Sequence, residues 1–344
     1  AHEYAIYICD EHTVNERLLL NYGLRWSGFV QVGPFERNIK DNSNILGQVS
    51  TDTIITYDSG EVVEDYGGIE PRFSLRFLLN ESTSMKFGMV QNYQYIHLAS
   101  LASSSLPTDV WLPSSDVVLP QLGRQVSLGF YKNFFDNKYE TSIEGYYKKM
   151  DNLVEYAENY VPGLSIGVDN VDNNLTFGTG TSYGIELFAS KRRGNLNGWV
   201  GYTLSKTTRK FENLNNGIEF FSKFDRTHDL SLVLNYQITN RLNLSSVFVY
   251  ATGNTLTIPN SVYFMDGEII TEWGARNSYR MEPYHRMDLA LTYKNKPSKK
   301  FESSWTLSIY NIYNRQNPYF IYFEPDGVLT EGQDLQITAQ QVSI

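Results

Sequence analysis

Residues 284–313 carry two runs of alternating side chains, and this alternation constrains the fold more than any other feature of the sequence. Polar and apolar residues alternate in both runs, with the two-residue period of a β-strand, and the polar segment KNKPSKK separates them. The apolar face carries Met287, Leu289, Leu291, Tyr293, Trp305, Leu307 and Ile309. Each run has about ten residues, the length of a tilted membrane-spanning strand, and aromatic residues lie near the ends. The stretch therefore predicts a hairpin of a transmembrane β-barrel, with lipid on its apolar face and a wet lumen on the other.

Composition supports this interpretation and excludes several other classes. The chain has 344 residues, 41% of them hydrophobic and 19% charged, with a net charge of −9. No apolar run approaches the length of about 18 residues that a spanning helix requires, so a membrane protein of this sequence must be a barrel. The acidic balance argues against a nucleic-acid partner, and one cysteine, Cys9, excludes an intrachain disulfide framework. The start, AHEYAIYIC, has no initiator Met, and we expect a cut or processed end.

Twelve segments share the strand pattern, and their connections alternate between short and long. The predicted strands are residues 2–9, 17–32, 70–79, 84–94, 122–132, 139–149, 181–191, 196–207, 227–238, 241–251, 284–294 and 301–313. A barrel of the bacterial outer membrane has this rhythm, because short turns face the periplasm and long loops face outward. A soluble sandwich has no reason to keep it.

The alternation also predicts which face meets lipid. In PRFSLRFLL, Phe73 and Leu75 lie opposite Arg72 and Arg76. Charged side chains are costly against lipid and inexpensive in a wet lumen, so the arginine face is expected to be the inner one.

Several stretches resemble one known family when they are taken together. They are GGIEPRFSLRFLLNESTSMKFGMVQNYQYIHLAS, SLPTDVWLPSS, YETSIEGYYKKMDNLVEY, SYGIELFASKRRGNLNGWVGYTLSKTTRKF, FDRTHDLSLVLNY, YRMEPYHRMDLALTY and SSWTLSIYNIYNRQNPYFIYF. The combination resembles the C-terminal part of a TonB-dependent outer-membrane transporter of the Bacteroidota type. The resemblance implies a 22-stranded barrel around an N-terminal plug domain. It also implies substrate binding at the outer face and energy supplied by the TonB complex from the inner membrane.

We therefore expect residues 1–344 to form the C-terminal portion of one all-β, transmembrane antiparallel barrel. The count is about twelve strands plus the start of another, because GQDLQITAQQVSI resembles a last outer loop entering a strand. The plug domain and the TonB-contacting segment are expected outside this sequence. On its own, the chain is not expected to close a barrel or to transport.

The histidines do not indicate a catalytic or metal site. None of the five has zinc-ligand spacing: His2, His12, His97, His228 and His285. His97 enters a long outer loop, where a haem or metal-chelate contact competes with a simple hydrogen-bonding role. His228 and His285 lie at strand starts in Arg/His/Asp clusters, and we interpret these clusters as salt-bridge networks at the edge of the lumen rather than as a hydrolase site. The other members are Arg226, Asp229, Arg286 and Asp288.

Three loops carry residue types found in catalytic or ion-binding sites but lack the required spacing. The serine-rich residues 98–107 lack a nucleophile elbow, and the glycine-rich residues 170–184 match neither GxGxxG nor a phosphate loop. The acidic loop 33–69 has no EF-hand spacing. No catalytic residue, metal ligand or cofactor is therefore predicted.

Aromatic side chains in the outer loops are better candidates, because their faces suit sugars, peptides or siderophores. The predicted ligand-binding residues are Tyr93, Tyr95, His97, Trp111, Trp273 and Tyr279, and Tyr263 is a further outer aromatic. The predicted function is TonB-dependent import of a nutrient or metal complex of the siderophore, glycan or peptide class. The predicted partners are the TonB complex, the imported ligand, outer-membrane lipid, and a surface lipoprotein or other outer-membrane proteins. An outer-membrane scaffold and a stand-alone twelve-stranded barrel hydrolase are the alternatives.

Overall fold

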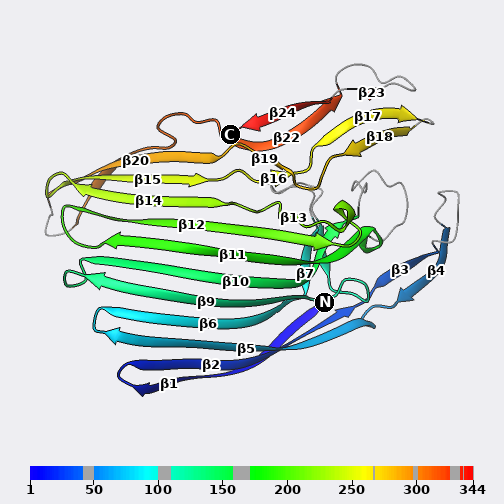
Figure 1. The fold of residues 1–344 in the computed structure, drawn as a ribbon, viewed down its shortest axis with the longest axis horizontal. Helices are drawn as coiled ribbons and strands as arrows, with labels where there is room; N and C mark the ends of the chain where they lie inside the picture. Colours follow the sequence, from blue (N-terminus) through cyan, green and yellow to red (C-terminus); the bar gives the residue numbers. More distant parts are fainter. Residues whose placement is uncertain are drawn as a thin grey trace.

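Long antiparallel strands lie side by side in sequence order in the computed structural model, and among the described residues they form one 13-stranded sheet (Figure 1). The structure describes residues 1–41, 50–99, 110–157, 171–265, 268–296, 301–325, 334–335 and 337–343. The main path of the sheet runs through β1 (His2–Asn15), β2 (Leu18–Val32), β5 (Val62–Asn80), β6 (Thr83–Gln94), β9 (Gln121–Phe134), β10 (Tyr139–Tyr156), β11 (Leu175–Lys191), β12 (Leu196–Phe211), β14 (His228–Gln237), β15 (Leu242–Ala251), β20 (Tyr284–Lys294) and β21 (Ser304–Ile309). The short β13 (Phe220–Phe221) pairs with β12. Among the described residues, no helix is long and apolar enough to cross a membrane.

Every predicted strand lies on this path, which confirms the all-β antiparallel fold class. The predicted boundaries are wrong in several places. A turn was expected at residues 10–16, but β1 continues to Asn15, whose Oδ1 accepts hydrogen bonds from the N–H groups of Arg17 and Leu18. β10 and β11 extend past residues 149 and 181 at the opposite end. Apolar alternation marks only the part of a strand that meets lipid, whereas the hydrogen-bond ladder continues into the polar sequence beyond it.

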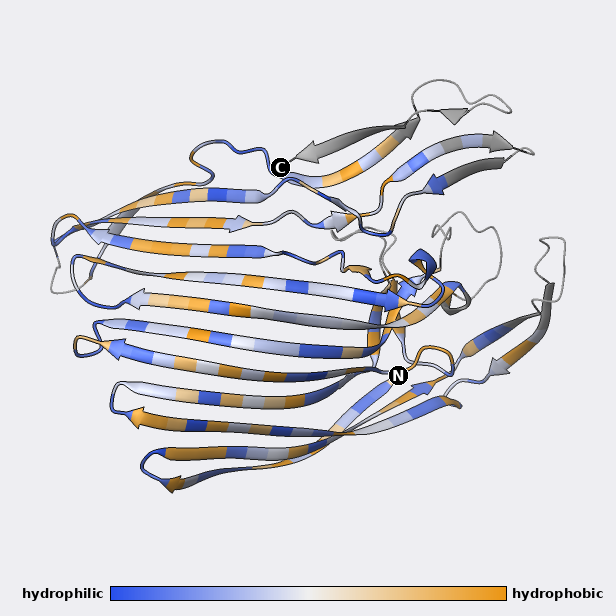
Figure 2. Cartoon of the chain, in the orientation of Figure 1, coloured by the Kyte–Doolittle hydropathy of each residue, from blue (hydrophilic) through white to orange (hydrophobic). Residues whose placement is uncertain are grey.

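Cross-strand pairing places apolar side chains in continuous rows on one face of the sheet. One row runs from Leu20 through Leu75, Phe87 and Leu128, each paired with the next across neighbouring strands. These side chains are large and partly or largely exposed, and Leu128 is 53% exposed. Figure 2 shows the alternation of hydrophobic and hydrophilic residues along the strands. Exposed apolar rows fit a lipid environment, and we call this side the lipid face.

The opposite face carries charged and hydrogen-bonded side chains, and we call it the lumen face. In the strand register, Arg25 of β2 lies opposite Glu70 of β5, and Arg76 of β5 lies opposite Lys86 of β6. The hydroxyl of Tyr131 donates to Glu144 Oε2 over 2.6 Å. The parity predicted for Arg72 and Arg76 is therefore confirmed by the register.

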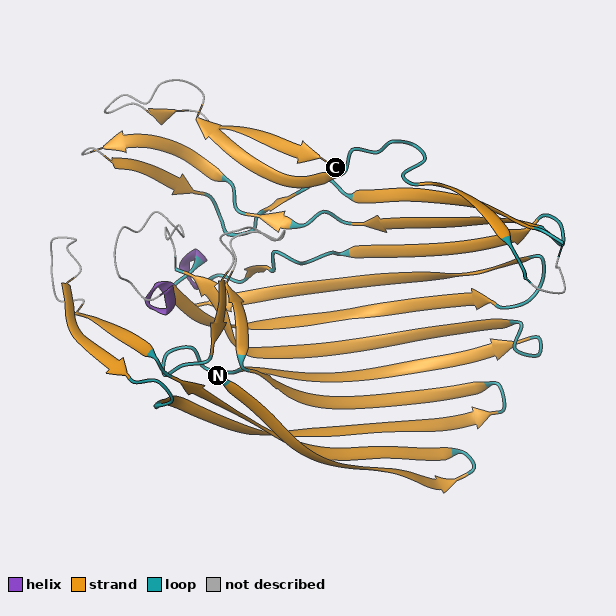
Figure 3. Ribbon diagram, turned by 180° about the vertical axis from the view of Figure 1, so that it is seen from behind, coloured by secondary structure: helices purple, strands orange, loops and turns teal. Residues whose placement is uncertain are grey.

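The two ends of the sheet differ, as the alternation of connections predicted. Short turns join the strands at one end, and longer connections with small hairpins and two 3₁₀ turns project from the other (Figure 3). The latter is called the outer end below. The 3₁₀ turns are η1 (Val171–Asn174) and η2 (Asn215–Gly217). The small outer strands are β3 (Phe35–Asp41), β4 (Ser50–Tyr57), β7 (Ile96–Ala99), β8 (Val110–Pro113), β16 (Thr255–Leu256), β17 (Pro259–Met265), β18 (Glu268–Trp273), β19 (Tyr279–Arg280), β22 (Pro318–Pro325), β23 (Asp334–Leu335) and β24 (Ile337–Ser343).

The last part of the chain forms a separate two-stranded sheet beside the main path, and the expected start of a further barrel strand stays a prediction. The segment after β21 stays beside β20, because the N–H of Ile312 donates to the carbonyl of Met287 and Asn317 Oδ1 accepts from the N–H of His285. β22 follows, and β24 runs antiparallel to it.

A first prediction tests the two faces. Leu232→Arg and Leu289→Arg place a charge on the lipid face in mid-strand, and each should destabilise the membrane-folded protein by about 2–4 kcal/mol. Ser231→Arg and Ala290→Arg, one residue away on the lumen face, should cost clearly less. The measurement is folding of the full-length protein into lipid vesicles, and equal costs for the two pairs would contradict the assignment of faces.

A second prediction tests the orientation. In a Cys9→Ser background, cysteines introduced at Asp58 and Ile218, at the outer end, should react with a membrane-impermeant thiol reagent on intact cells. Cysteines at Glu81 and Asn137, in the short turns, should react only after the outer membrane is opened. Equal labelling of all four on intact cells would rule out this topology.

Candidate functional site at the outer end

A buried carboxylate organises the lumen face near the outer end of β2, β5 and β6. Glu70 is 2% exposed, and its Oε1 accepts hydrogen bonds from Ser27 Oγ (2.9 Å) and from the N–H of Tyr93 (3.1 Å). Its Oε2 lies 3.6 Å from both Arg25 Nε and Arg72 Nη2. Two cations and two hydrogen bonds compensate the buried charge, so this cluster holds β2, β5 and β6 in a fixed geometry near their outer ends.

Two of the predicted ligand-binding residues stack over this cluster. The rings of Tyr93 and Tyr95 are 6.3 Å apart and nearly parallel, and Tyr95 also stacks on Phe29 at 5.4 Å. Tyr95 is only 2% exposed, and its hydroxyl shares a 2.8 Å hydrogen bond with Ser27 Oγ. In this conformation Tyr95 is packed against β2 and is not open to a ligand, and Tyr93 is the more accessible of the two.

His97 on β7 is fully buried. Its Nε2 shares a hydrogen bond of 2.9 Å with Ser114 Oγ. Burial lowers the pKa of His97 to about 4, so the ring is neutral near pH 7. Its position ties the β7/β8 hairpin together and gives no open face to a haem or metal complex. Within the described ranges, no three His, Cys, Asp or Glu side chains are grouped to hold a metal ion.

The other predicted aromatics are exposed. Trp111 on β8, Trp273 on β18 and Tyr279 on β19 are 66%, 38% and 42% exposed. They lie on three different outer hairpins, so the fold presents them separately at the outer end. Such side chains supply large contact areas to a ligand at little conformational cost.

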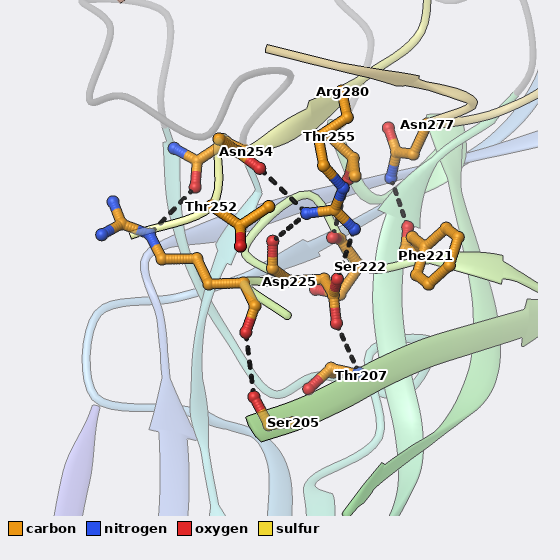
Figure 4. A network of polar contacts seen from close by, with 12 residues as sticks. Ser205, Thr207, Phe221, Ser222, Asp225, Thr252, Asn254, Thr255, Asn277 and Arg280 are labelled. Carbon is orange, nitrogen blue, oxygen red and sulfur yellow. Dashed lines mark hydrogen bonds and ion pairs between the residues drawn. The ribbon is translucent and has the colours of Figure 1, made fainter. Parts of the chain in front are cut away.

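A buried ion pair joins the outer connections to the sheet (Figure 4). Asp225, whose side chain is fully buried, lies 2.6 Å from Arg280 Nη2 of β19 and accepts a 2.6 Å hydrogen bond from the N–H of Thr207 on β12. Arg280 Nη1 also donates to the carbonyl oxygens of Asp225 and Gly253, each over 2.9 Å. The connection between β12 and β14, which holds Asp225, and the one between β15 and β20, which holds Gly253 and Arg280, therefore meet at one guanidinium.

Side chains around this pair add further ties. Thr255 Oγ1 donates to the carbonyl of Ser222, and Asn277 Nδ2 donates to the carbonyl of Phe221, each over 2.8 Å. The loop carbonyls that regular structure leaves free are thus satisfied by short polar side chains.

A second buried carboxylate lies beside a small apolar cluster at the same end. Glu155 pairs with Arg209 and, over 3.4 Å, with Arg276 Nη2. The apolar cluster next to it consists of Leu153, Phe211, Leu214 and Phe220. Neither carboxylate cluster was predicted. The signal available in the sequence was an acidic residue at a strand end with arginines on adjacent strands, and register is needed to join them.

The predicted Arg/His/Asp clusters are divided between the two faces. Arg286 Nη2 and Asp288 Oδ2 pair over 3.0 Å on the lumen face, as expected for a salt bridge at its edge. His228 and His285 lie on the lipid face, where their Nδ1 atoms share hydrogen bonds with Tyr202 and Tyr313 (2.8 and 2.9 Å). The prediction that these histidines join the lumen network is wrong, because adjacent residues of a strand point to opposite faces.

The arrangement suits ligand contact at a rigid rim. Residues 100–109, most of the serine-rich segment, and 42–49 of the acidic loop lie outside the described residues.

The family model "TonB dependent receptor-like, beta-barrel" matches residues 1–314, and the chain belongs to this family. The resemblance inferred from the sequence is thereby confirmed at family level, and the Bacteroidota type stays a prediction. A search of curated proteins gives no match.

Solved structures of the same fold include several receptors. The ferripyoverdine receptor of the outer membrane of Pseudomonas aeruginosa is 15% identical with a TM-score of 0.55, covering 91% of this chain and 35% of that one. The FrpB iron transporter from Neisseria meningitidis is 16% identical with a TM-score of 0.56, covering 99% and 45%. The copper transporter OprC is 13% identical with a TM-score of 0.59, covering 92% and 42%. The chain thus spans less than half the length of these proteins.

A third prediction concerns the buried ion pair. Asp225→Ala leaves Arg280 without its partner and should lower the free energy of unfolding of the outer end by about 3–5 kcal/mol. Glu282→Ala removes the more exposed pair with Arg315 and should change it by about 0–1 kcal/mol. Limited proteolysis of the folded protein measures both, and equal resistance of the two variants would contradict a structural role for Asp225.

Proposed function

We propose that this chain is the barrel part of a bacterial outer-membrane receptor that imports a nutrient or metal complex with energy from the TonB complex. The observation that carries the proposal is the family match over residues 1–314, on a sheet with an apolar lipid face and an ion-paired lumen face. The TonB contact is assigned to a part of the protein outside this chain. No bond is broken in this activity, so the protein is not an enzyme.

The ligand is proposed to bind at the outer end. Trp111, Trp273 and Tyr279 supply exposed aromatic surface there, and Tyr93 adds a partly exposed ring that stacks on Tyr95. Tyr95 and His97 act one layer behind, because both are buried. The structural neighbours are named for ferripyoverdine, iron and copper, which supports a metal complex ahead of a glycan or peptide. Outer-membrane lipid is a further proposed partner, as is a surface lipoprotein or another outer-membrane protein.

A fourth prediction separates binding from uptake. In the full-length protein, replacing Trp111, Trp273 and Tyr279 together with Ala should weaken ligand binding by at least about tenfold, since each stacked aromatic contributes about 0.5–1.5 kcal/mol beyond area burial. Phe135→Ala, an exposed aromatic in a short turn at the other end, is the matched control and should bind normally.

The same assay tests energy coupling. Ligand bound to whole cells and ligand accumulated inside them are measured in wild-type and TonB-deficient strains. Binding should persist and accumulation should stop without TonB. Accumulation that is undiminished without TonB would reject the proposal and favour a passive pore, whereas binding without accumulation in either strain would favour a scaffold.

A further inference from the structure

The lipid face contains a groove that the proposed import does not use. The groove has a volume of about 600 Å³ and crosses β6, β9, β10, β11 and β12. One row of its lining runs from Phe87 through Leu128, Gly145 and Ile185 to Leu204, each residue paired with the next. The groove is therefore a built feature of five adjoining strands, and its floor is apolar.

A glycine creates the hollow. Gly145 occupies the middle of this row, where every other position carries a large apolar side chain. A Cβ placed on Gly145 would meet only the carbonyl oxygen of Gly184, at 3.9 Å, so the space above it is open. Tyr147 and Tyr183, one row nearer the outer end, are about half exposed and form its aromatic wall.

Cations border the groove on its outer side. Lys206 lies opposite Tyr183, in the same row as the two tyrosines, and lines the groove itself. Arg124 of β9 and Lys149 of β10 lie opposite each other one row nearer the outer end, and about half of each side chain is exposed. Asp151 offsets one of the three charges through Arg124 Nη1 (2.9 Å) and Lys149 Nζ (3.8 Å), so the border keeps an excess of two positive charges.

We propose that this groove binds a phosphorylated, multiply acylated glycolipid of the lipid A type. An acyl chain lies in the apolar hollow over Gly145, and a phosphate of the headgroup contacts Arg124, Lys149 and Lys206. Charge complementarity selects this occupant: the cations stand at the outer border of an otherwise apolar surface, in a chain of net charge −9. Arginine and lysine on a lipid face are costly in hydrocarbon, and a phosphate at the interface gives them a partner. The inference rests on the outer-membrane location proposed above.

The experiment uses the full-length protein in detergent micelles with added diphosphoryl lipid A or its dephosphorylated form, and native mass spectrometry counts retained lipid. Gly145→Leu fills the hollow and should reduce retention of both forms. The triple variant Arg124→Gln/Lys149→Gln/Lys206→Gln should reduce retention of the diphosphoryl form by about tenfold, the factor for one lost charged hydrogen bond, and leave the other form unchanged.

Two controls and a folding check accompany the variants. Ala189→Leu enlarges a lipid-face residue of β11 away from the groove, and Lys86→Gln removes a lumen-face cation; both should retain lipid as the wild type does. Each variant is first shown to be folded by its heat-dependent shift on electrophoresis.

Unchanged retention in folded Gly145→Leu and in folded triple-Gln protein would overturn the proposal. So would loss of a co-purifying protein, with lipid unaffected, in Gly145→Leu. Ligand accumulation is measured in parallel, so TonB-independent accumulation with groove-dependent lipid retention would reject the proposed import while leaving the lipid site in place.

Discussion

The requirement that every backbone N–H and C=O be hydrogen-bonded inside hydrocarbon governs this structure. Strands meet it only by pairing with their neighbours, and the strands of the main sheet do so in sequence order, joined alternately by short turns and by longer outer connections. Once the ladder is set, each side chain has no choice of face, because successive residues point in opposite directions. Lipid on one side and water on the other then decide which residues each position accepts.

The outer end obeys a different rule, because its connections leave the ladder. There the polar groups are satisfied by buried carboxylates paired with arginines, as Asp225 is with Arg280 and Glu155 with Arg209. These pairs join segments separated by about fifty residues of sequence, so the loops form a defined rim instead of independent flaps. Arg280 lies next to Tyr279 in β19, so its pair with Asp225 helps to hold one of the exposed aromatics on which the proposed ligand contact depends.

The strands and the two faces were predictable because alternation is a local signal, repeated twelve times. The strand ends were less predictable, since residues such as those beyond Lys149 continue the ladder without apolar alternation. The site was only partly predictable. Trp111 and Tyr279 are predictable as outer aromatics, but the burial of Tyr95 and His97 depends on packing between elements far apart in the chain. The alternation along β14 and β20 already places His228 and His285 on the lipid face. The prediction instead grouped them with Arg226, Asp229, Arg286 and Asp288 because these residues are neighbours in the sequence.

The burial of the Asp225–Arg280 pair has a consequence for the water outside the cell. Dissolved salt screens exposed charges over about 8–10 Å at moderate ionic strength, and it weakens a pair less when one partner is fully buried, as Asp225 is. Exposed contacts such as Arg315–Glu282 will loosen as salinity rises, while the buried pair holds Thr207, Gly253 and Arg280 in place. The contacts of Arg280 with Asp225 and Gly253 are therefore expected to be less sensitive to salt concentration than the exposed ion pairs of the same end.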